Sequence, residues 1–339
     1  MGRYLLRGAI CLRYYHYTAP KRLQAVASTT NLKALTDVDT FRENAFNSGN
    51  PFHFRNVSKD GDKSDLPAAS KWFESISDKI SPVPLHTLSP TLAQYLDWPF
   101  PFELVSKPSE QNPSLVAFRD WLLQTQDVTS QMLAEMLQPA ISELPDRSFF
   151  QLYAPLRLLK KALEFNQTTI ENDGAPVLLY IAQSSLTDLP PALQEDLPTP
   201  HLVQHAGKGD VYNSSIWLGT EPTYTPIHRD PNPNLFYQLC SHKIMRLLPP
   251  TIGDRVYFEV QAKIRQHGNS RIRTTEMMEG KEREALHEAI WANEKISDHL
   301  LEVDLAPGDA LFIPKGWWHS VKSKNSMGHL NGSVNWWFR

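Results

Sequence analysis

Cysteine is scarce in this chain of 339 residues, which has only Cys11 and Cys240. Two cysteines exclude a framework of several disulfides and a zinc site built from cysteine thiolates. Glycine is also sparse, since 15 glycines are outnumbered by 26 prolines, and stiff loops are therefore expected. No apolar run approaches the roughly 20 residues that span a bilayer, so the sequence predicts no transmembrane helix.

Acidic residues are absent from the first 36 positions, and Asp37 is the first carboxylate. Six basic residues fall there among aromatic and aliphatic ones: Arg3, Arg7, Arg13, Lys21, Arg22 and Lys33. Such a start is typical of a mitochondrial transit peptide, so residues 1–36 are predicted to direct the protein to the mitochondrial matrix. A disordered basic tail with no targeting function is the alternative. All 37 acidic and the other 28 basic residues follow, which gives the remainder a formal charge of −9 and argues against broad nucleic-acid binding.

The character of the chain changes near residue 176. Before it, residues 115–123, 129–137 and 149–165 have apolar positions at helical spacing, and residues 82–113 are proline-rich, which indicates a surface connection. We therefore expect residues 37–175 to be a helical and irregular part that packs on a barrel. After it, short apolar runs predict a mainly β domain over residues 176–339, a double-stranded jelly roll. The runs are 177–182, 211–218, 234–239, 244–249, 256–260, 300–305, 310–313 and 333–338.

Two motifs bring together side chains that bind metals. His228 and Asp230 are one residue apart, so on a strand they face the same side. His319 follows a short apolar run and a Lys315-Gly316 turn, which places it at the start of another strand. Two imidazoles and one carboxylate can occupy one face of an octahedral Fe(II) and leave the opposite face open. Either histidine alone could equally be a hydrogen-bonded core residue.

An ordered set of motifs surrounds these three residues. They are Trp217-Leu218-Gly219-Thr220, Thr225-Pro226, Asn234, Lys243, Leu247-Leu248-Pro249-Pro250, Pro307-Gly308-Asp309, Phe312-Ile313-Pro314, Trp318-His319 and Val334-Asn335-Trp336-Trp337. This set resembles the JmjC oxygenases of the cupin fold, and most of all the branch that contains the asparaginyl hydroxylase factor inhibiting HIF. The resemblance implies a double-stranded β-helix and an enzyme that uses Fe(II), 2-oxoglutarate and O2.

The resemblance also implies a role for individual residues. His228, Asp230 and His319 correspond to the metal ligands and catalytic centre. Lys243 corresponds to the lysine that pairs with the distal carboxylate of 2-oxoglutarate, and Thr225 and Tyr180 to hydroxyls that bind the same group. Asn234 and Asn335 correspond to amides near the iron and the co-substrate. As the alternatives, Lys243 could be a solvated strand residue, and Thr225 and Tyr180 ordinary parts of the core.

An insertion at residues 261–299 interrupts the predicted strands. It begins with a stretch that contains Lys263, Arg265, Arg271 and Arg273 and no acid, and a helix is expected over residues 281–295. The insertion is either a lid or substrate-binding element over the open side of the metal, or a solvated excursion.

The reaction implied is hydroxylation of a macromolecular substrate, or demethylation where the oxidised carbon is an N-methyl group. A protein side chain is the expected substrate. A JmjC enzyme that modifies tRNA and a catalytically silent cupin that binds a metal or a partner are the alternatives. The sequence does not indicate the oligomeric state.

Overall fold

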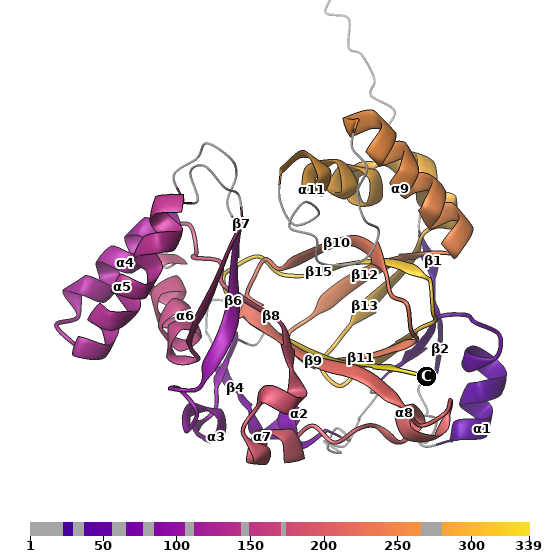
Figure 1. The fold of residues 1–339 in the computed structure, drawn as a ribbon, viewed down its shortest axis with the longest axis horizontal. Coiled ribbons are helices and arrows are strands. Elements are labelled where there is room, and N and C mark those ends of the chain that lie inside the picture. Colours follow the sequence, from indigo (N-terminus) through magenta and orange to yellow (C-terminus); the bar gives the residue numbers. More distant parts are fainter. Residues whose placement is uncertain are drawn as a thin grey trace, which may run out of the picture.

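Two β-sheets face each other across the interior of the protein (Figure 1). The computed structural model describes residues 23–29, 37–55, 66–76, 85–105, 112–143, 149–170, 174–265 and 280–339. In this part, the large sheet has the strand order β2-β3-β14-β11-β16-β9-β8-β6-β7, and the small sheet has the order β1-β13-β12-β15-β10. A separate pair joins β4 (Phe73–Ile76) and β5 (Leu85–Leu88).

Eight consecutive strands form the jelly roll. They are β9 (Val211–Thr220), β10 (Tyr224–Arg229), β11 (Asn234–Cys240), β12 (Lys243–Leu248), β13 (Leu301–Leu305), β14 (Ala310–Ile313), β15 (Trp318–Ser323) and β16 (Leu330–Phe338). Of these, β9, β11, β14 and β16 lie in the large sheet, and the other four in the small one. This connectivity is a double-stranded β-helix, and the predicted fold is confirmed.

The N-terminal half extends the large sheet at both ends. Strand β3 (Phe52–Phe54) pairs with β14, while β8 (Tyr180–Ser185), β6 (Pro99–Val105) and β7 (Phe149–Pro155) continue the sheet beyond β9. Helices α4 (Pro113–Gln124), α5 (Val128–Glu143) and α6 (Arg157–Ile170) pack beside this extension (Figure 1).

The expectation of a helical and irregular part over residues 37–175 is therefore incomplete, because strands β3 to β7 also lie in this range. The proline-rich stretch contains β6, which tolerates Pro99 because the first residue of a strand need not donate a ladder hydrogen bond. Residues 149–155 were expected to be helical and instead form β7 against β6. Pairing between distant segments outweighs the local signals here.

Residues before position 37 already form part of the folded domain. Strand β1 (Gln24–Ala25) pairs with β13 in the small sheet, β2 (Ala27–Thr29) pairs with β3 in the large sheet, and Val26 between them is buried. The predicted leader of residues 1–36 thus overlaps the folded domain. Residues 1–22 and 30–36 lie outside the described ones.

Helices cover the outer face of the small sheet (Figure 1). They are α9 (Pro250–Ile264), α11 (Gly280–His287), the π-helical segment η4 (Glu288–Ala292) and the 3-10 segment η5 (Glu294–His299). The strand predicted at 256–260 is wrong, because Val256 and Val260 are buried one turn apart on α9. The insertion accordingly begins near residue 250 rather than 261, and Arg271 and Arg273 lie outside the described residues.

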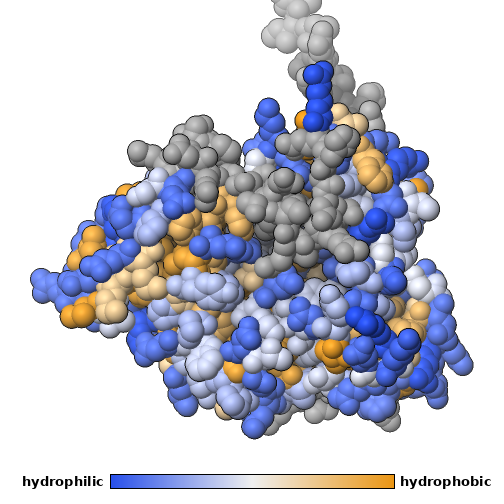
Figure 2. All heavy atoms as spheres, in the orientation of Figure 1, coloured by the Kyte–Doolittle hydropathy of each residue, from blue (hydrophilic) through white to orange (hydrophobic). Residues whose placement is uncertain are grey.

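Short elements connect these layers. They are α1 (Val38–Phe41), η2 (Arg42–Phe46), α2 (Pro67–Lys71), α3 (Pro90–Ala93), η3 (Leu186–Asp188), α7 (Pro191–Glu195) and α8 (His201–His205). Figure 2 shows a mainly hydrophilic face with apolar side chains near α4 and α5, where Leu123, Val128 and Met132 are exposed. No helix in the described part has the length and apolar character that crossing a bilayer requires.

Candidate metal site

The two predicted metal motifs meet between neighbouring strands. Strand β10 carries His228 and leads directly into Asp230, and β15 carries His319. These strands pair antiparallel with His228 directly opposite His319. The ligand atoms of all three side chains lie within 4.8 Å of one another, and all three residues are buried. The structure thus brings together the three residues that the sequence assigned to the metal.

Backbone carbonyls fix the tautomers of both imidazoles. The Nδ1 atom of His228 lies 2.8 Å from the carbonyl oxygen of Pro226, and that of His319 lies 3.2 Å from the carbonyl of Trp317. Because a carbonyl only accepts, each Nδ1 carries the proton and donates it. Each Nε2 then presents the lone pair that a metal requires. Nε2 of His319 lies 3.6 Å from Oδ2 of Asp230, so this nitrogen faces the carboxylate.

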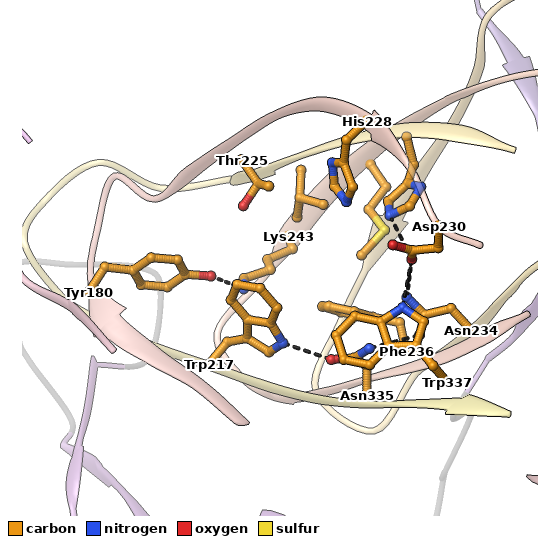
Figure 3. Close-up of a pocket in the computed structure, with 13 residues that line it drawn as sticks. Tyr180, Trp217, Thr225, His228, Asp230, Asn234, Phe236, Lys243, Asn335 and Trp337 are labelled. Carbon is orange, nitrogen blue, oxygen red and sulfur yellow. Dashed lines mark hydrogen bonds and ion pairs between the residues drawn. The ribbon is translucent and has the colours of Figure 1, made fainter. Parts of the chain in front are cut away.

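A chain of side-chain amides and indoles holds the carboxylate (Figure 3). Oδ2 of Asp230 accepts from Asn234 Nδ2 at 3.1 Å and from Trp337 Nε1 at 2.8 Å. Asn335 Nδ2 donates to Asn234 Oδ1 at 3.0 Å, and Trp217 Nε1 donates to Asn335 Oδ1 at 2.8 Å. Both predicted asparagines therefore orient Asp230, directly or through one another.

A buried lysine lies in the same cavity. Nζ of Lys243, at the start of β12, donates to Ser333 Oγ at 2.9 Å and to Tyr180 Oη at 3.3 Å. Within the described residues, no carboxylate forms an ion pair with it, although the charge of Glu221 acts on it. Burial lowers the pKa of Lys243 to about 7. A buried ammonium with neutral partners is a binding site for an anion.

One cavity joins these groups, with about 370 Å³ of empty space that includes solvent at its mouth. All eight residues that the sequence singled out line it, together with Trp217, Phe236, Met245, Val321 and Trp337. The sequence assigned no role to these five, or to Ser333. Strand alternation could have predicted two of these residues. Ser333 and Trp337 lie two positions before and after Asn335 on β16, so they share its face of the strand.

The donor set suits a divalent transition metal. Two neutral imidazoles and one carboxylate converge from one side, which is the arrangement that binds Fe(II) and leaves other coordination positions open. Hydrogen-bonded partners behind every ligand strengthen this fit. At the other end of the cavity, Lys243 and the Tyr180 hydroxyl offer donors to a carboxylate, and Thr225 lines the wall near them (Figure 3).

The described part of the insertion does not line this cavity. Arg283 Nη2 on α11 donates to the carbonyl of Tyr224 at 3.4 Å, and Trp291 on η4 donates to Ser320 Oγ at 3.0 Å. The side chains of Lys322 and Arg246, from β15 and β12, lie over the Trp291 ring at 4.3 and 4.6 Å. These contacts fasten the insertion to the outer face of the small sheet, so the described part is not a lid over the metal.

Comparison with known proteins identifies similar chains. The cupin-like domain family matches residues 38–339. The chain is 29% identical over 181 residues to "Lysine-specific demethylase JMJ30" of Arabidopsis thaliana, a match that covers 52% of this chain and 37% of the relative. It is 30% identical over 173 residues to "Lysine-specific demethylase 8" of Danio rerio, covering 50% and 38%. "Jumonji C domain-containing protein 5" of Drosophila melanogaster is 29% identical over 147 residues, covering 43% and 34%. The matches thus span little more than a third of each relative.

Proposed function

This chain belongs to the cupin-like domain family, and on that premise we propose that it is an Fe(II)- and 2-oxoglutarate-dependent oxygenase that oxidises a protein side chain. The observation that carries the proposal is the coexistence of two binding groups in one cavity. The triad of His228, Asp230 and His319 occupies one end, and the buried Lys243 the other. The triad suits the metal and the lysine suits a carboxylate, which together match a dicarboxylate that chelates iron.

The protein's own groups would bind and orient the reactants. His228, Asp230 and His319 would hold Fe(II), whose chemistry with O2 and 2-oxoglutarate supplies the oxidising power. Lys243, Tyr180 and Thr225 would hold the distal carboxylate of 2-oxoglutarate. The rings of Trp217, Trp337 and Phe236 line the cavity and would keep water from the oxidation.

The names of the relatives bear on the substrate. Two of them are called lysine-specific demethylases, which supports a protein side chain as the substrate. Hydroxylation and demethylation begin with the same oxidation of a C–H bond, so the same site could perform either reaction. Nothing in the described residues favours tRNA. A silent cupin is disfavoured by the fully partnered triad and by Lys243.

Co-substrate turnover tests the proposal. We expect the purified chain with Fe(II) to convert 2-oxoglutarate to succinate, and His228→Ala, Asp230→Ala and His319→Ala to lose both this activity and metal binding. The surface variant His299→Ala is the control and keeps both. Lys243→Met is expected to raise the dissociation constant of 2-oxoglutarate by roughly 10- to 100-fold, since a hydrogen bond to a charged group contributes about 1.5–3 kcal/mol. A wild-type protein that binds the metal but not 2-oxoglutarate would be a silent cupin.

A further inference from the structure

Strand β10, which carries His228, lies at an edge of the small sheet. Among the described residues it pairs with β15 alone, and its register shifts between Thr225 and His228. The strand ends at Arg229, so Asp230 lies just outside it. Because the ladder of an edge strand is one-sided and an irregular register interrupts it, the sheet alone holds this end of β10 weakly. Contacts from outside the sheet therefore decide how firmly two of the three candidate ligands are placed.

A single carboxylate on the outer face of the sheet binds both strands of the metal site. Oδ1 of Asp254, on α9, accepts from Arg229 Nη1 at 2.8 Å and from Trp318 Nε1 at 3.0 Å. Arg229 lies between the first two candidate ligands in the chain, and Trp318 directly precedes the third. One side chain of the insertion thus contacts the immediate chain neighbours of all three ligands.

The groups that meet at Asp254 are themselves packed together. Arg229 and Trp318 stand opposite each other in the register of β10 and β15, and the guanidinium carbon lies 5.4 Å from the centre of the indole ring. Trp318 is fully buried, and α9 approaches its ring so closely at Gly253 that any side chain there would collide with it. Tyr257 packs on the same indole with its ring centre 5.0 Å away. Helix α9 is therefore seated on Trp318, which fixes where Asp254 lies.

The ion pair of Asp254 and Arg229 is not placed to stabilise the fold. Their side chains are 36% and 38% exposed, and solvent screens such a pair so that it contributes little to stability. Neither residue lines the cavity, so neither touches the metal or the co-substrate. What the carboxylate does supply is direction, because it accepts from one donor on each strand at the same oxygen.

We propose that Asp254 is a positioning residue for the metal, which acts through Arg229 and Trp318 to fix the end of β10 against β15. This inference rests on the metal site of the proposed function. Without the carboxylate, the end of β10 can shift relative to β15, and the three ligands no longer keep the separation that one ion requires. The insertion thus acts on a site that its described part does not line.

Four variants and a matched control test the contact. Asp254→Ala removes it, Arg229→Ala removes one of its donors, and a double variant combines them. Asp254→Asn keeps the shape of the side chain and removes its charge. The control is Glu302→Ala, which breaks the 2.8 Å pair of Arg246 and Glu302. That arginine also lies over an indole, the ring of Trp291, but β12 and β13 carry no candidate ligand.

The probe is Mn(II), titrated into the metal-free protein by calorimetry. We expect Asp254→Ala to raise the dissociation constant about tenfold, the low end of the effect of losing a partner behind a metal ligand. Arg229→Ala should raise it less, and the double variant should match Asp254→Ala, because both residues act through one contact. Asp254→Asn should change it in the same direction by a smaller factor, since a neutral acceptor makes weaker bonds.

Two further measurements separate positioning from folding. The metal-free variants should melt as Glu302→Ala does, because both ion pairs are partly exposed. The electron paramagnetic resonance spectrum of bound Mn(II) should broaden in Asp254→Ala and stay unchanged in Glu302→Ala. An unchanged Mn(II) affinity in Asp254→Ala, or an equal loss in Glu302→Ala, overturns the proposal. A double variant that binds much more weakly than Asp254→Ala overturns it as well.

Failure of the positioning role is distinguishable from failure of the oxygenase. If the wild type binds Mn(II) and forms succinate with Fe(II), while Asp254→Ala binds Mn(II) equally well, the oxygenase stands and the role of Asp254 is wrong. If the wild type binds no Mn(II), the proposed function fails at its metal site, and the inference fails with it.

Discussion

The indole Nε1 of Trp337 donates a hydrogen bond of 2.8 Å to Oδ2 of Asp230, 107 residues earlier in the chain. Asn234 donates to the same oxygen, so all described hydrogen bonds to this carboxylate fall on Oδ2. The side chain is therefore held in one orientation beside His319, whose Nε2 lies 3.6 Å from the same oxygen. The last strand of the jelly roll thus orients a candidate metal ligand that directly follows its second strand.

Removing this indole donor is expected to weaken the metal site. We predict that Trp337→Phe lowers the affinity for Mn(II) or Co(II) by about 10- to 100-fold, the usual effect of losing a hydrogen bond to a metal ligand. Calorimetric titration of the metal measures it. Trp336→Phe is the control, because Trp336 is buried in the core on the opposite face of the same strand. An unchanged affinity in Trp337→Phe would show that Asn234 alone suffices.

Binding of 2-oxoglutarate is expected to take up a proton at Lys243. Burial lowers its pKa to about 7, so at pH 8 most molecules hold the amine neutral. A bound carboxylate favours the ammonium and raises that pKa again. We predict an uptake near zero at pH 6 that approaches one proton at pH 8, with an affinity that falls as the pH rises above about 7. Calorimetry in two buffers of different ionisation enthalpy measures the uptake.

The groups around Lys243 allow this titration to be assigned. Tyr180, Ser333 and Phe236 face it as neutral partners. The nearby acids are Cys240 and Glu221, and burial raises the pKa of both. In Lys243→Arg the guanidinium stays charged, so the pH-dependent uptake should vanish. If it persists, Glu221 or another group titrates. The ligand-free protein should also gain stability between pH about 7 and 10.5, where folding releases this proton.

The sequence alone predicts the candidate metal site better than the architecture around it. His228 and Asp230 share a strand, so their common orientation follows from local geometry. The position of Ser333 beside Lys243, and the β-bulge between Ile181 and Ser184 of β8, depend on the register between strands, which no short motif encodes. The sheet extension was missed because β6 and β8 pair across about 80 positions that contain three helices. Residues 256–260 were misassigned because a short apolar run fits a buried strand and a buried helix equally.

Trp291 is expected to anchor the insertion to the barrel. Trp291→Ala removes its hydrogen bond to Ser320 and its contacts with Lys322 and Arg246, and should lower the free energy of unfolding by about 2 kcal/mol. Urea denaturation measures this loss. Phe258→Ala is the control, because Phe258 on α9 is 64% exposed and its removal should cost at most about 0.5 kcal/mol. If Trp291→Ala instead abolishes succinate formation at full stability, the insertion acts on the site directly.

The segment before Leu23 is expected to contain the mitochondrial targeting signal. Residues 1–22 contain five of the six basic residues and no acid, so a reporter fused to them alone should enter mitochondria as well as one fused to residues 1–36. A reporter that stays diffuse in the cytosol would contradict the prediction of a targeting signal.

The folded domain sets a limit on how much of this segment can be removed. Deletion of residues 1–22 leaves β1, Val26 and β2 in place, so the melting temperature should stay close to that of the full chain. Deletion of residues 1–29 removes one strand from each sheet, and the loss of buried Val26 alone costs about 2 kcal/mol. We predict that the second deletion melts well below the first. Equal melting temperatures would mean that β1 and β2 add nothing to the stability of the jelly roll, and that a leader could be cleaved anywhere up to residue 36.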